Sequence, residues 1–159
     1  MDHAEEAMLP APVLKLLGKG VLMPAPFSVD VGEEIDPGRI SPDGVVFYGG
    51  TKISGAQTLI SAGTKLGCEA PVTVADCQLG RGVELKGGFF KSSVFLDQAN
   101  IASGAQVREG CLLEEEANGS HTVGMKQTIL FPFVTLGSLI NFCDIFLAGG
   151  TSRKDHSEV

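Results

Sequence analysis

The chain has 159 residues, of which 43% are hydrophobic and only 19% are charged, and its formal net charge is −7. This length suits one domain with its own core, and the composition excludes an intrinsically disordered chain. Nucleic-acid binding depends on clustered lysine and arginine, and the sequence has no such cluster, so a nucleic-acid partner is excluded.

Residues 1–28 are predicted to form a leader, with a short helix followed by an extended linker. The apolar pattern over residues 4–17 favours a helix, which Pro10 and Pro12 restrict to fragments and Gly20 ends. The leader is acidic at its start, and no apolar run reaches the length of about 18 residues that a membrane span needs. We therefore expect a soluble, cytoplasmic protein without a membrane partner.

Residues 29–151 are predicted to form one repetitive β domain. An apolar anchor recurs at steps of mostly six residues over much of the segment 53–113, and a small residue often follows four places later. The anchors are Ile53, Ile60, Leu66, Val72, Leu79, Leu85, Phe95, Ile101, Val107 and Leu113. A three-sided parallel coil needs one inward side chain on each short strand and a tight turn after it. The period therefore predicts an all-β fold, a parallel β-helix; a β-sandwich or barrel is the alternative.

Four phenylalanines follow in the last part of this domain, close to successive coil spacings. They are Phe131, Phe133, Phe142 and Phe146. We interpret them as a stack that fills the core, with an aromatic ligand platform as the alternative.

The four cysteines lack the paired spacing of zinc sites or disulfide frameworks. They are Cys68, Cys77, Cys111 and Cys143. We interpret them as buried free thiols and predict no metal-ligand set.

The repeat resembles that of the hexapeptide-repeat family of transferases, and the match covers roughly residues 29–150. Segments 133–140 and 144–151 are most similar to the acetyltransferase region of the bifunctional UDP-N-acetylglucosamine pyrophosphorylase / glucosamine-1-phosphate acetyltransferase family. The resemblance implies a left-handed β-helix and a homotrimer with active sites between neighbouring helices. It also implies a place in sugar-nucleotide biosynthesis, with acyl transfer from acetyl-CoA or another acyl-CoA to a phosphorylated amino sugar.

The sequence departs from that family at three signature positions. Pro132 stands where the family has its catalytic histidine, Thr135 replaces a tyrosine, and Asp144 replaces an asparagine. A second hypothesis is therefore a non-catalytic β-helix that assembles an oligomer or binds a sugar nucleotide. A third is a metal-dependent lyase of the γ-carbonic-anhydrase kind, which is built on the same fold and would need three histidines gathered across subunits.

Five residues are candidates for chemistry. Acyl transfer to an amine needs a base, and His121 is the candidate. It follows the acidic run 114–116, from which a carboxylate could hold its tautomer. Lys126, Arg153 and Lys154 are candidate phosphate contacts, and Asp144 is a candidate hydrogen-bond partner of the substrate. For each charged residue, the alternative is a solvated surface position.

Residues 152–159 are predicted to form a charged tail. Repeat stacks need polar caps at both ends, and the resembling proteins usually continue past this point. We therefore expect residue 159 to be a truncation point in a longer protein.

Overall fold

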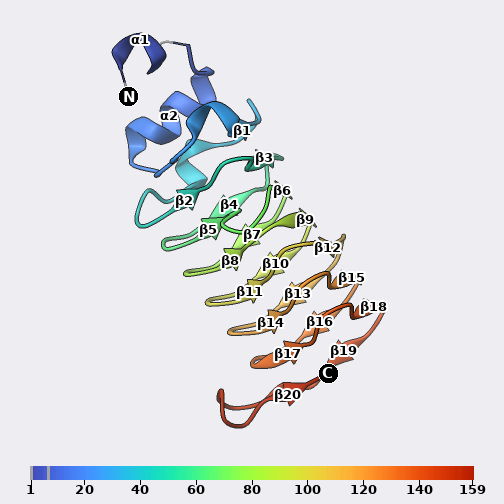
Figure 1. Ribbon diagram of the computed structural model, residues 1–159. Coiled ribbons are helices and arrows are strands. Elements are labelled where there is room, and N and C mark those ends of the chain that lie inside the picture. The colour runs from blue at the N-terminus through green and yellow to red at the C-terminus, as the bar shows by residue number, and fades with distance from the viewer. Residues whose placement is uncertain (1, 7) are drawn as a thin grey trace.

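A computed structural model describes residues 2–6 and 8–159 and shows a parallel β-solenoid (Figure 1). The described residues form three parallel sheets, of seven, six and seven strands, and successive coils add strands to each. Sheet I contains β1 (Asp30–Val31), β3 (Lys52–Ser54), β6 (Val72–Ala75), β9 (Gly88–Lys91), β12 (Ala105–Val107), β15 (Gly124–Lys126) and β18 (Asn141–Cys143). Sheet II contains β4 (Leu59–Ile60), β7 (Gln78–Leu79), β10 (Val94–Phe95), β13 (Leu112–Leu113), β16 (Ile129–Leu130) and β19 (Phe146–Leu147). Sheet III contains β2 (Val46–Phe47), β5 (Lys65–Leu66), β8 (Glu84–Leu85), β11 (Asn100–Ile101), β14 (Asn118–Gly119), β17 (Val134–Leu136) and β20 (Ser157–Glu158).

The anchors of the repeat fill the axis of the solenoid, which confirms the predicted all-β fold and parallel β-helix. In sheet II, Leu79, Phe95 and Leu113 pair with one another across β7, β10 and β13, and each is fully buried. Burial of such a side chain stabilises the fold by roughly 1.5–3 kcal/mol. Side chains alternate between the two faces of a strand, so the residue before each anchor points outward.

The corner between sheets II and III shows how the turns repeat. Gly63 and Gly82 have φ values of 76° and 65° at equivalent turns of successive coils. Further along the stack Gln98, Glu116 and Phe133 take φ values of 63°, 58° and 63° at this corner. The left-handed turn therefore also forms in coils that have no glycine at this position. Backbone hydrogen bonds between coils hold it, such as the one from Glu116 N to Asp97 O at 3.0 Å.

The leader covers the N-terminal end of the solenoid (Figure 1). It forms α1 (His3–Glu6) and α2 (Ala11–Lys19), and Val13 and Leu16 of α2 are buried in the core. Two 3₁₀ turns follow, η1 (Pro26–Ser28) and η2 (Pro37–Arg39). None of the helices in the described part of the chain is long and apolar enough to cross a membrane.

The segment 152–159 returns to the stack at the opposite end. Residues 152 and 155 form an antiparallel bridge around a turn, and β20 then pairs with β17.

Two predictions about side chains are confirmed only in part. Phe142 packs against the core as predicted. Phe131 and Phe146 do not stack in the core; they are 37% and 68% exposed on the outside of sheet II, because each lies next to an inward residue. All four cysteines are free, but only Cys77 and Cys111 are buried. Cys68 and Cys143 lie in corner positions and are exposed.

Candidate functional site

The outer face of sheet II carries a set of outward apolar side chains that we call the apolar ladder. Its residues are Val94, Leu96, Leu112, Ile129, Phe131 and Phe146. Val94, Leu112, Ile129 and Phe146 pair in register on consecutive strands, so about 4.8 Å separates each from the next. Contiguous exposed apolar surface of this kind marks interaction sites in proteins.

The ladder is most exposed at its C-terminal end. Ile129 is 38% exposed there, next to the two outward phenylalanines. The rings of Phe131 and Phe146 pack edge to face, with centroids 5.9 Å apart. This aromatic pair gives a rigid contact surface at low cost in side-chain entropy.

The corner between sheets I and II, on one side of the ladder, is basic. Lys91, Arg108 and Lys126 follow one another at this corner on consecutive coils, because each stands at the end of its sheet I strand or directly after it. Glu109 lies 3.4 Å from the Lys91 ammonium and 4.0 Å from Nε of Arg108, so it offsets part of this charge. The three consecutive coils keep a net positive charge at this corner, and Asp144 adds a negative charge there in the following coil.

The corner between sheets II and III, on the other side of the ladder, is acidic. Asp97 lies there in one coil, and Glu114, Glu115 and Glu116 lie there in the next. Arg153 offsets one charge, since its Nε lies 3.7 Å from Glu116 Oε1 and its guanidinium lies over the ring of Phe133. We call the corner of sheets I and II the basic edge and the corner of sheets II and III the acidic edge. The apolar ladder runs between these two edges of opposite charge.

The opposite charges also share heights along the solenoid axis. Lys91 and Asp97 flank β10 within one coil, and Arg108 and Glu115 flank β13 in the next. A rotation about an axis parallel to the solenoid leaves heights unchanged. Such a rotation therefore brings basic and acidic edges of two copies together at matching levels.

The third corner, between sheets III and I, holds His121. Its Nε2 lies 3.6 Å from Oε2 of Glu69, which comes from an earlier coil. The same oxygen accepts a hydrogen bond from the backbone N–H of Ser103 at 3.2 Å, and Lys86 Nζ lies 3.9 Å from the other oxygen. The His121 side chain is 64% exposed. The acidic run 114–116, which we considered as its carboxylate partner, lies at a different corner.

Gly87 lies between Ala70 and Ser103 of the neighbouring coils, where a side chain would not fit. A Cβ on Gly87 would lie 2.8 Å from Cβ of Ala70 and 3.1 Å from Cβ of Ser103. The hydrogen bond from the Ser103 backbone, together with Lys86 and His121, lowers the pKa of the Glu69 carboxyl group. Glu69 is thus a carboxylate that lies beside the exposed His121 imidazole.

The other predicted site residues lie at other corners. Lys126 and Asp144 are neighbours at the corner of sheets I and II, where Asp144 N donates to Lys126 O at 3.2 Å. Arg153 lies beside the acidic edge, and Lys154 lies in the turn 152–155, where its N–H donates to Ser152 Oγ. One chain therefore brings Lys126 and Asp144 together but keeps them apart from His121. Across residues 2–6 and 8–159, no three His, Cys, Asp or Glu side chains group as metal ligands.

Neither the apolar ladder nor the partners of His121 were predicted from the sequence. The signal for the ladder was present, since most of its residues directly precede or follow an anchor, and those positions are apolar over several coils. No protein-family model matches this chain, and no curated protein sequence does so either.

Proposed function

We propose that this domain is a non-catalytic assembly module that forms a homotrimer through sheet II. The observation that carries the proposal is the apolar ladder, which lies between edges of opposite charge. Homo-oligomers usually adopt closed rotational symmetry, and a ring needs two different surfaces that fit each other. The basic and acidic edges supply such a pair of surfaces.

The apolar ladder and the two oppositely charged edges favour a second copy of this chain as the binding partner of sheet II. The acidic edge of one protomer meets the basic edge of the next at the same height when the symmetry axis is parallel to the solenoid. The apolar ladder then lies in the middle of the contact, where water is excluded and burial contributes most. Three protomers follow from the resemblance to the trimeric hexapeptide-repeat family.

Light scattering coupled to size-exclusion chromatography tests the proposal. We expect the wild-type chain to have about three times its 16.6 kDa mass. Ile129→Asp places a charge in the middle of the ladder, and we expect it to yield monomers at micromolar concentration because an unpaired buried charge costs several kcal/mol.

The matched control is Gln106→Asp, which adds the same charge to an exposed outward position on sheet I. We expect this variant to remain trimeric. A monomeric wild-type protein contradicts the proposal, and so does a trimer that Ile129→Asp leaves intact.

A second candidate function is acyl transfer from acetyl-CoA to a phosphorylated amino sugar, in the sugar-nucleotide chemistry that the resemblance implies. The close approach of His121 to a charged Glu69 favours it, because a carboxylate that orients an imidazole makes a competent general base. Lys126, Arg153 and Lys154 would bind phosphate groups from other corners, and Asp144 would accept a substrate hydroxyl. Because these residues lie apart from His121 within one chain, a neighbouring protomer would have to place them next to His121.

Acetyl-CoA turnover with glucosamine-1-phosphate tests this candidate. If His121 is the base, His121→Ala lowers the rate by about 100-fold and Glu69→Gln lowers it by about tenfold. Absence of turnover, or a His121→Ala variant that is as active as the wild type, rules it out.

A further inference from the structure

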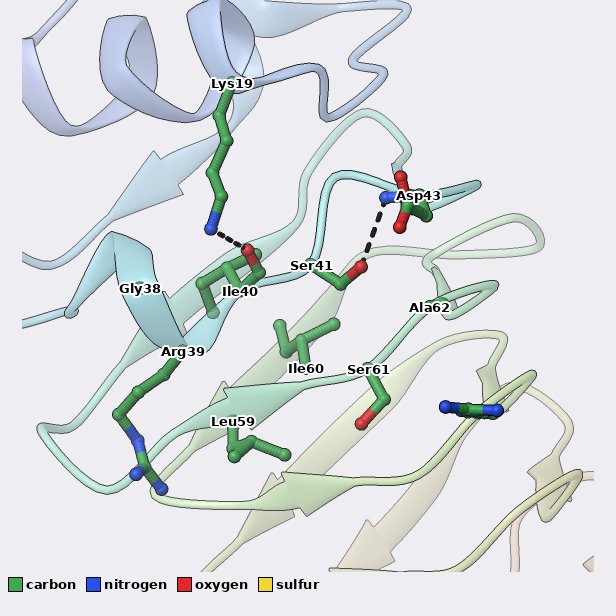
Figure 2. A pocket seen from close by; sticks show the side chains of 11 residues that line it. Lys19, Gly38, Arg39, Ile40, Ser41, Asp43, Leu59, Ile60, Ser61 and Ala62 are labelled. Carbon is green, nitrogen blue, oxygen red and sulfur yellow. Dashed lines mark hydrogen bonds between the residues drawn. The ribbon is translucent and has the colours of Figure 1, made fainter.

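The N-terminal end of sheet II is hollowed into an open groove, and three cationic side chains are among the residues that line it. Two of them, Lys19 and Arg39, are labelled in Figure 2. The cavity volume of the groove is about 360 Å³, and sites for small molecules usually measure roughly 300–1,000 Å³. Lys19 comes from α2, Arg39 from η2 and Arg81 from the turn after β7. In a chain with a net charge of −7, three cations from separate elements along one groove are a local reversal of charge.

Two of these cations are held in place by backbone carbonyls. The Lys19 ammonium donates to the carbonyl oxygens of Pro37 and Ile40. The Arg39 guanidinium donates to Thr58 O at 3.3 Å and to Gln57 O at 3.2 Å. Each group keeps further N–H donors that these bonds do not use, so both are positioned and still able to bind an anion.

Arg81 is the free cation of the groove. Its side chain is exposed, and within the described residues the structure gives its guanidinium no hydrogen-bond or ion-pair partner. Its backbone N–H is held instead by Asp97 Oδ1 at 2.8 Å, which fixes the turn from which the side chain projects. A guanidinium without a partner at the rim of a groove is suited to bidentate binding of phosphate.

The other lining groups suit hydroxyls and an apolar ring face. Asp43 is an exposed carboxylate, and its N–H donates to Ser41 Oγ at 3.2 Å, which leaves the serine O–H as a donor. Ser61 adds a second hydroxyl, and Leu59 adds an outward apolar surface beside them (Figure 2). Carboxylate and hydroxyl groups bind sugar hydroxyls, and an aliphatic side chain packs on the C–H face of a sugar ring.

We propose that this groove binds the phosphate group of a small, polyhydroxylated phosphate ester. Arg81 binds the phosphate, Lys19 and Arg39 add positive charge to the groove, and Asp43 and the two serines bind hydroxyl groups. The proposal does not depend on trimer formation, because every group named here belongs to one chain.

Isothermal titration calorimetry of the full chain at low ionic strength, with inorganic phosphate and glucose 6-phosphate as probes, tests the proposal. We expect glucose 6-phosphate to bind about fivefold more tightly than inorganic phosphate, because only the ester offers hydroxyls. Arg81→Gln should weaken both by about tenfold, since a charge-assisted hydrogen bond is lost. Lys65→Gln is the matched control, as Lys65 is exposed on sheet III in the same part of the stack, and it should bind like the wild type.

Asp43→Ala separates the two parts of the site. It should abolish the preference for glucose 6-phosphate without weakening the binding of inorganic phosphate, because it removes a hydroxyl acceptor and a repulsive charge together. Equal affinities for the two probes in the wild type overturn the assignment of the hydroxyl subsite. The site is wrong if Arg81→Gln binds phosphate with wild-type affinity. It is also wrong if Lys65→Gln loses as much affinity as Arg81→Gln. Ile129→Asp changes the ladder and leaves the groove as it is. This variant should therefore bind phosphate like the wild type, whether or not it still forms a trimer, so that failure of this proposal can be told from failure of the assembly proposal.

Discussion

The two halves of sheet II have the same backbone and different outer surfaces. In the N-terminal half the outward positions are Leu59, Ser61, Gln78 and Gly80, and cations line the groove there. In the C-terminal half the outward positions carry the apolar ladder. Their inward anchors are equally buried. A solenoid thus keeps its core constant along the stack and changes its function through the residues that point outward.

The edges of sheet II change along with its face. Beside the ladder, the two flanking corners have opposite charge, whereas beside the groove Arg39 and Arg81 bring positive charge to both. If the ladder is an interface between copies and the groove a site for phosphate, substitutions in one half should leave the other half unaffected.

Among further substitutions beside the ladder, the largest effect is expected from reversing the basic edge. Arg108→Glu combined with Lys126→Glu places like charges against the acidic edge of the next protomer. We expect the dissociation constant of the trimer to rise by about tenfold or more, since exposed ion pairs contribute roughly 0.2–1 kcal/mol each and like charges repel. Sedimentation equilibrium over a range of protein concentrations measures this change.

A rescue variant makes this prediction specific. Adding Glu114→Lys and Glu115→Lys to the same chain exchanges the signs of the two edges, so complementarity returns and the trimer should recover. These positions leave the pair of Glu116 and Arg153 intact. Failure of the rescue, in a variant that keeps the wild-type circular dichroism spectrum, would mean that the two edges do not meet.

The fold could be predicted from the sequence because the hexad period constrains inward positions. Leu79, Leu113 and their equivalents must be apolar to fill the axis, and this requirement leaves a signal in one sequence. Outward positions carry no such requirement. Phe131 and Phe146 were assigned to the core because they match the coil spacing, yet they lie on the outer face of their strands.

The partners of His121 could not be predicted for a different reason. Glu69, Ser103 and His121 meet only because the coils between them have particular lengths, and each insertion or deletion in a turn changes which residues share a corner. The sequence pattern instead favoured the acidic run 114–116, which is close to His121 along the chain. Proximity in sequence is a poor guide in a solenoid, where contacts join successive coils.

A smaller effect is expected from extending the ladder toward the groove. Gln78 pairs with Val94 in sheet II and interrupts the apolar series there. Gln78→Leu should tighten association by about fivefold, because added apolar burial outweighs the loss of the hydrogen bond that Gln78 Nε2 donates to Gln57 O. Sedimentation equilibrium again gives the dissociation constant of the trimer. An unchanged constant would mean that the interface ends on the C-terminal side of β7.

The smallest effect concerns two exposed thiols at different distances from the ladder. Cys143 lies at the basic corner beside Lys126, whereas Cys68 lies at the corner of sheets III and I. Desolvation raises the pKa of the Cys68 thiol, and the Asp144 carboxylate, which accepts a hydrogen bond from Cys143, raises that of Cys143. Both should therefore react slowly with iodoacetamide at neutral pH and faster as pH rises, because the thiolate is the reactive form.

Comparison of the wild type with Ile129→Asp then reports where the interface lies. Burial at a junction between protomers should slow the alkylation of Cys143 about threefold in the trimer, through lost access and a less available thiolate. Cys68 should react at the same rate in both proteins, since its corner faces away from sheet II. Cys77, whose pKa burial raises to about 11, should stay unmodified in both and report that the core is intact. Equal slowing of Cys68 and Cys143 would place the contact somewhere other than sheet II, because only an interface at that sheet protects one corner and leaves the opposite one open.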